Sequence, residues 1–162
     1  MAIDHSRRAF FRAKPKSPPP LRPPYSGNED AFLESCTQCN KCIDACETGI
    51  IKKGAAGFPE IDFNIDECTF CGLCADACEP KALNNNLHPA FNNQISIAGN
   101  CLAVNKVHCM SCKDACETEA IKFDLFKTSI PTPEIILADC TSCGACVSVC
   151  PQGSIEIKPK LT

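Results

Sequence analysis

The stretch CTQCNKCIDAC, residues 36–46, decides the fold of this chain. Its cysteines follow the pattern C-x2-C-x2-C-x3-C, and the same pattern returns over residues 68–78 and 140–150. Three thiolates from a tight loop and a fourth from the next helical turn form the ligand run of a 4Fe-4S cluster, and in proteins with two such clusters the fourth cysteine binds the other cluster. The spacing therefore predicts iron-sulfur clusters.

The composition agrees with a chain that metal or cross-links hold together. Sixteen of the 162 residues are cysteine, beside ten aromatic residues and no tryptophan. A disulfide scaffold is one alternative, but it requires an oxidising compartment. A zinc scaffold without redox activity is another, although three cysteines at successive two-residue gaps are uncommon at zinc sites. We expect iron-sulfur clusters and keep both alternatives open.

A fourth cysteine group turns the pattern into an internal repeat. The segment DACETEAIK around Cys116 is a near copy of DACETGIIK around Cys46. In this group Cys101 stands eight positions before Cys109, where the other groups leave three, so the loop has a five-residue insertion. A longer loop adds little closure entropy. We therefore predict that Cys101 is a ligand, the alternative being a more labile site with three thiolates.

The four groups predict an α+β fold of two tandem two-cluster units, each with short antiparallel strands and short helices around its clusters. Strands are expected within residues 58–63, 133–137 and 154–158, where apolar residues recur. An apolar residue five positions after each fourth cysteine is expected in the core. These core residues are Ile51, Leu83, Ile121 and Ile155.

The predicted organisation has three parts. Residues 1–30 form an extended, basic, proline-rich arm, residues 31–88 the first unit and residues 89–158 the second. The asparagine-rich stretch NNNLHPAFNN, residues 84–93, is expected to be the loop that joins the units.

Crossed ligation assigns the sixteen cysteines to four clusters. The expected sets are Cys36, Cys39, Cys42 with Cys78; Cys68, Cys71, Cys74 with Cys46; Cys140, Cys143, Cys146 with Cys116; and Cys109, Cys112, Cys150 with Cys101.

The residue after the second cysteine of a group is expected to adopt positive φ and to let the backbone approach the cluster sulfur. Gly72 and Gly144 suit this position, and Asn40 can mimic them. Met110 cannot easily do so, so the third group is doubly irregular. No cysteine is left over as a nucleophile and no serine, histidine and carboxylate triad is recognisable, so we expect no substrate-converting site.

The chain resembles the ferredoxin-type proteins of the periplasmic nitrate reductase system. The resemblance rests on SRRAFFRAK at residues 6–14, RPPYSG at residues 22–27, the four cysteine groups and the stretched third group CLAVNKVHCMSCKDAC. It implies a cytoplasmic protein that binds the precursor of the nitrate reductase catalytic subunit and assists its iron-sulfur or redox maturation before export. The alternative is a one-electron carrier or wiring subunit between a quinol-linked donor and a reductase.

The basic arm carries the expected partner-binding residues Arg7, Arg8 and Arg12. Arg7 and Arg8 fit a twin-arginine export signal, but the basic, proline-rich sequence that follows lacks an apolar run, so export is not expected. Residues 1–22 hold six basic residues against one acidic residue, while the rest holds ten against eighteen. The arm is expected to dock on a partner or on the anionic inner membrane surface, the alternative being a solubilising tail. The acidic body does not suit nucleic acid.

Overall fold

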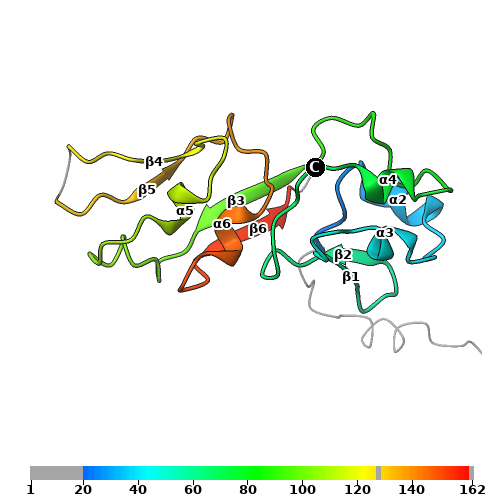
Figure 1. Cartoon of the computed structure of the whole chain (residues 1–162), viewed down its shortest axis with the longest axis horizontal. Coiled ribbons are helices and arrows are strands. Elements are labelled where there is room, and N and C mark those ends of the chain that lie inside the picture. Colours follow the sequence, from blue (N-terminus) through cyan, green and yellow to red (C-terminus); the bar gives the residue numbers. More distant parts are fainter. Residues whose placement is uncertain (1–19, 127–128, 161–162) are drawn as a thin grey trace, which may run out of the picture.

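The computed structural model describes residues 20–126 and 129–160, which form two units placed end to end along the long axis of the molecule (Figure 1). The first unit contains α2 (Glu29–Ser35), α3 (Lys41–Asp44), β1 (Ile51–Lys53), β2 (Pro59–Ile61) and α4 (Leu73–Asp76). The second contains β3 (Asn93–Ile97), α5 (Ser111–Asp114), β4 (Ile121–Phe123), β5 (Pro133–Ile135), α6 (Ala145–Ser148) and β6 (Ile155–Pro159). The expected α+β fold of tandem units with short elements is confirmed.

The second unit has two antiparallel sheets of two strands each. β3 pairs with β6, placing Ile95 opposite Ile157, and β4 pairs with β5, placing Ile121 opposite Ile135. Sheets this small are marginal in isolation. Their stability therefore depends on the packing between them, where Ile95, Ile121 and Ile155 are buried.

In the part of the chain that the structure describes, the first unit has a single sheet, the hairpin in which β1 pairs with β2 and Ile51 lies opposite Ile61. An extended segment lies along it, since Leu21 O accepts a hydrogen bond of 2.8 Å from Ile61 N–H. The same segment joins the loop between the units, because Tyr25 N–H donates to Ala90 O at 2.8 Å. Residues 20–27, which we expected to belong to an extended arm, thus pack on the first unit.

Arg22 explains why this segment docks. Its guanidinium lies 5.3 and 5.6 Å from the ring centroids of Phe32 and Phe58, and its Nη2 is 2.7 Å from a carboxylate oxygen of Glu29. Cation-π contact and a charge-assisted hydrogen bond together hold the segment against the unit. The first nineteen residues, with Arg7, Arg8 and Arg12, lie outside the described part of the chain.

Helix α2 was not expected from the sequence. Asn28 caps it, because its side-chain oxygen accepts hydrogen bonds from the backbone N–H groups of Asp30 and Ala31. Phe32 is the buried residue of the helix. The helix spans the boundary that we placed between residues 30 and 31, and that boundary stays a prediction.

Two further expectations concern the core and a strand of the second unit. Ile51, Leu83, Ile121 and Ile155 are all buried, at most 5% exposed, which confirms that expectation. The strand expected within residues 133–137 is β5, which ends at Ile135, and Leu137 beyond it is 65% exposed. Across residues 20–126 and 129–160, no helix is both long and apolar enough to cross a bilayer.

Candidate iron-sulfur cluster sites

Each cysteine group lies in a loop that leads into a four-residue helix. The residue before the helix has φ of 64° at Asn40, 79° at Gly72 and 90° at Gly144, the left-handed conformation that we expected there. Met110 instead has φ of −133°. The third group therefore differs from the others in backbone conformation as well as in loop length, as its sequence predicts.

A cavity in the first unit is lined by four cysteines that come from both of its groups. Three belong to the first group and one to the second, and Phe32 and Leu83 also line the cavity. The four cysteines are Cys36, Cys39, Cys42 and Cys78. The chain thus brings together one of the crossed sets expected from the sequence.

A second cavity in the same unit is lined by the complementary set. Its cysteines are Cys46, Cys68, Cys71 and Cys74, and Ile50, Ile51 and Phe70 also line it. Two cavities, each surrounded by four thiols and apolar side chains, suit a group that needs thiolate ligands and exclusion of water. The donor sets of the first unit therefore fit two 4Fe-4S clusters.

Burial strongly raises the pKa of some thiols of the first unit. Together with the effect of neighbouring thiolates, it raises the pKa of Cys74 to about 12 and that of Cys42 to about 11. Burial opposes the thiolate of Cys46 too, but the backbone N–H of Ile51 and the hydroxyl of Thr48 outweigh it and lower the pKa of Cys46. The loop around Cys46 thus supplies N–H and O–H donors that stabilise the thiolate.

Backbone N–H donors also reach the fourth cysteine of the later groups. Leu83 N–H donates to Cys78 Sγ at 3.4 Å, Ala120 N–H to Cys116 Sγ at 3.3 Å, and Ser154 N–H to Cys150 Sγ at 3.2 Å. Hydrogen bonds to the sulfurs are among the features that set cluster potentials.

The second unit gathers its cysteines into two triplets. The thiolates of Cys143 and Cys140 add to burial in raising the pKa of Cys146 to about 12, so these three lie together. Cys101 and Cys109 likewise add to burial in raising the pKa of Cys112 to about 11. The positions of Cys116 and Cys150 as fourth ligands stay predictions.

The inserted loop before Cys109 folds into a compact turn. Asn105 stabilises this turn, because its side-chain amide donates to Gly99 O at 2.7 Å and to Cys101 O at 2.9 Å. Ala103, in the middle of the insertion, is 1% exposed. The turn takes up the extra residues and leaves Cys101 near Cys112, although its ligation stays a prediction.

Two features of the sites were missed by the sequence analysis. Tyr25, the one tyrosine of the chain, is 7% exposed, and burial together with Cys68, Cys74 and Cys71 raises its pKa. Its hydroxyl is 3.4 Å from Phe70 O. The other is Phe63 of the first unit, which contacts Gly144 of the second and fills the space over that glycine. The signal that the sequence offers for Tyr25 is a lone tyrosine in the proline-rich segment RPPYSG.

All sixteen cysteines lie in the described part of the chain, and none of them forms a disulfide bond there. Among residues 20–126 and 129–160, no three histidine, cysteine or carboxylate side chains are placed to hold a single metal ion.

Comparison with known proteins gives the class. The model of the 4Fe-4S dicluster domain family matches residues 35–82 and again residues 107–154. Two dicluster domains and sixteen cysteines fit four 4Fe-4S clusters. The class is therefore that of ferredoxin-like proteins with two dicluster domains in tandem.

Similarity to whole proteins identifies the family within this class. The chain is 41% identical over 157 residues to the ferredoxin-type protein NapF of Escherichia coli K12, covering 96% of this chain and 95% of that protein. It is 41% identical over 138 residues to NapF of Haemophilus influenzae, covering 85% and 78%, and 28% identical to the ferredoxin-type protein NapG of Escherichia coli K12, covering 86% and 70%. No solved structure matches the chain. The chain belongs to the NapF family of ferredoxin-type iron-sulfur proteins.

Proposed function

We propose that this protein binds the precursor of the catalytic subunit of the periplasmic nitrate reductase in the cytoplasm and assists its iron-sulfur or redox maturation before export. The observation that supports iron-sulfur cluster binding is the pair of cavities in the first unit. Each cavity is lined by four cysteines in the crossed combination. The similarity to NapF proteins over nearly the whole chain supports the partner.

The ligand sets are part of the proposal. Each cluster takes three cysteines from one group and the fourth cysteine of the paired group, and Cys101 serves in place of the missing near cysteine of the third group. When bound, the clusters supply one-electron chemistry. The protein itself binds them, shields them with apolar side chains and donates hydrogen bonds to their sulfurs. The proposed role requires no substrate-converting site.

Charge supports a dedicated partner. The basic residues 1–22 precede an acidic body, and each oxidised cluster with four thiolates adds negative charge to that body. A basic segment on an acidic protein favours docking to a surface of matching charge. Arg7, Arg8 and Arg12 are the proposed partner contacts.

An anaerobic capture experiment tests this function. The cluster-loaded protein is immobilised and offered the catalytic subunit in two forms, the precursor with its export signal and the mature subunit. We expect capture of the precursor at least tenfold over the mature subunit. Equal capture of both forms, or of neither, would remove the maturation role.

A one-electron carrier is the second candidate, and one contact favours it. Cys68 N–H donates to Cys143 O at 2.8 Å, so a ligand loop of the first unit meets a ligand loop of the second. Such a contact suits electron passage between units. Capture of a quinol-linked donor, without capture of the precursor, would favour this candidate.

A further inference from the structure

The two units meet through an aromatic residue that is inserted against a glycine. Phe63 follows β2 in the first unit and is 3% exposed, and Gly144 precedes α6 in the second. A Cβ atom on Gly144 would lie 2.0 Å from Cδ1 of Phe63, closer than any side chain tolerates. Gly144 therefore meets two demands, since its φ of 90° also favours glycine.

Gly72, at the matching place of the first unit, meets only one of these demands. It also has positive φ, but a Cβ there would meet the side-chain amide of Asn85 at 3.3 Å, within its own unit. The close approach of a ring from the other unit is therefore specific to Gly144 and is not a general property of the cysteine loop.

Other rings fix Phe63 in place. Phe91 packs edge-on to Phe63, with ring centroids 5.8 Å apart, and also contacts Phe70 at 5.9 Å. Phe70 lies between Cys68 and Cys71, so the aromatic row connects the junction to a ligand loop. Edge-to-face pairs of this kind are directional, and they restrict the orientation of the rings.

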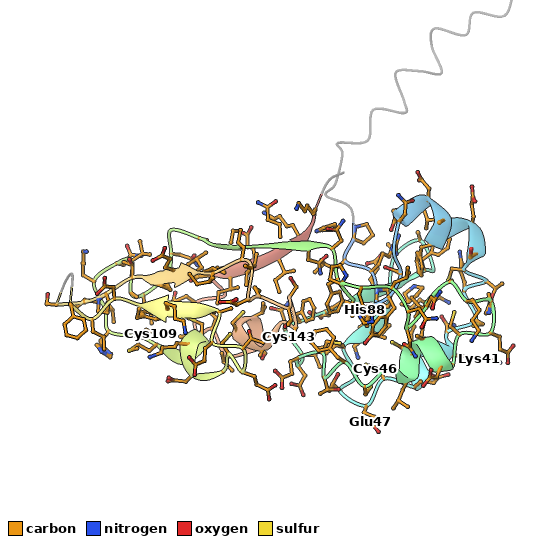
Figure 2. The ribbon with its side chains drawn as sticks, turned by 90° about the horizontal axis from the view of Figure 1, so that it is seen from above. Lys41, Cys46, Glu47, His88, Cys109 and Cys143 are labelled. Atoms are coloured by element: carbon orange, nitrogen blue, oxygen red, sulfur yellow. The ribbon has the colours of Figure 1, made fainter. Side chains whose placement is uncertain are left out.

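Main-chain and core contacts join the units at the same place. The 2.8 Å hydrogen bond from Cys68 N–H to Cys143 O links the two ligand loops directly. Val147 of α6 and Ile157 of β6 pack against the hydrophobic cores of both units. Figure 2 shows Cys143 near the middle of the molecule and Cys109 farther out, so Cys143 belongs to the ligand loop on the side of the first unit.

We propose that Phe63 and Gly144 lock the two units into one rigid body, and that this junction holds the Cys68 loop beside the Cys143 loop. Both residues are positioning residues and neither is a ligand. The protein then presents its cysteine sets in a fixed order, with the sets that contain Cys68 and Cys143 adjacent and the sets that contain Cys39 and Cys109 at the two ends. The proposal rests on the proposed function only in requiring that the sets hold clusters.

The test compares two truncations of buried or half-buried rings in the first unit. Phe63→Ala removes the ring at the junction, while Phe58→Ala removes a ring that packs within the first unit near Arg22 and Phe32. Each full-length variant is loaded with iron anaerobically and examined in two ways. Calorimetry counts the unfolding transitions, and electron paramagnetic resonance after reduction with dithionite, a one-electron donor, measures magnetic interaction between clusters.

We expect one unfolding transition and strong inter-cluster interaction in the unaltered protein. Phe63→Ala should separate the melt into two transitions at least about 4 °C apart and weaken the interaction while iron content stays the same. Phe58→Ala should lower the melting temperature and keep a single transition with unaltered interaction. If Phe63→Ala does not retain its iron, Phe63→Leu is measured instead, with a smaller change of both readouts expected.

Two transitions in the unaltered protein would overturn the proposal, as would a Phe63 variant that keeps one transition and the original interaction. Precursor capture is independent of both readouts. Loss of the capture preference with an intact junction would refute the proposed function alone, and a normal capture preference with independent units would refute the junction alone.

Discussion

Cys101 is the residue on which the number of clusters depends, since it stands outside the regular spacing and yet lies near Cys112. We predict that Cys101→Ser lowers iron content by about four atoms per protein, one cluster of the 4Fe-4S type. Cys78→Ser, in the regular first unit, is the matched comparison and should lose about the same amount. Iron analysis after anaerobic purification measures both, and full iron content in Cys101→Ser would show that Cys101 is no ligand.

Thr48 is placed to affect the midpoint potential of the cluster that Cys46 is proposed to bind. Its hydroxyl lies 3.6 Å from Cys46 Sγ. A hydrogen bond to a ligand sulfur stabilises the more negative, reduced state. Thr48→Val should therefore lower the midpoint potential of that cluster, by an amount on the order of tens of millivolts if the bond contributes about 1 kcal/mol.

Redox titration followed by spectroscopy measures the shift. Thr69→Val provides the control, since Thr69 lies in the loop between Cys68 and Cys71 and has no hydrogen bond to a sulfur among those described. A potential that rises or stays the same in Thr48→Val would contradict this account of Thr48.

At the scale of elements, the cap of α2 carries a prediction of its own. Asn28 Oδ1 accepts from Asp30 N at 2.9 Å, so Asn28→Ala should destabilise the first unit by about 1 kcal/mol. Asn28→Ser restores a capping oxygen and should recover most of the loss. Chemical denaturation of the cluster-loaded protein measures both variants, and equal stability of the two would remove the cap from the account.

The sequence predicts the elements near the cysteines better than those at the edges. The periodic SIEIK segment becomes β6 and the apolar residues after each group become core, because short-range spacing determines both. Helix α2 was missed, although Asn28 before Glu29 and Asp30 is a capping signal. The extended segment at Leu21 could not be foreseen, because its strand-like hydrogen bond depends on Arg22 docking against distant rings.

At the scale of the whole molecule, the sequence offers a pattern for the cysteine sets and none for the junction between the units. Crossed cysteine sets follow from the motif, and two cavities of the first unit contain two of those sets. The contact of Phe63 with Gly144 joins residues 81 positions apart in the chain. No local pattern encodes such a contact, since it depends on how two complete units meet (Figure 1).

The uneven distribution of charge along the chain predicts how salt affects partner binding. Replacing both Arg7 and Arg8 with Ala should leave iron content unchanged and weaken precursor capture several-fold at low salt, because exposed charges act over about 10 Å at 0.1 M salt. The difference from the unaltered protein should shrink as salt rises. Capture that does not depend on the arginine pair at any salt concentration would identify the arm as a solubilising tail.

The presence of four 4Fe-4S clusters is the central prediction for this protein. The measurement that tests it is the iron, acid-labile sulfide and zinc content of the anaerobically purified full-length chain. We predict about sixteen iron atoms and about sixteen sulfides per protein, with no stoichiometric zinc. Stoichiometric zinc with little iron and no sulfide would contradict it and would make the chain a zinc scaffold.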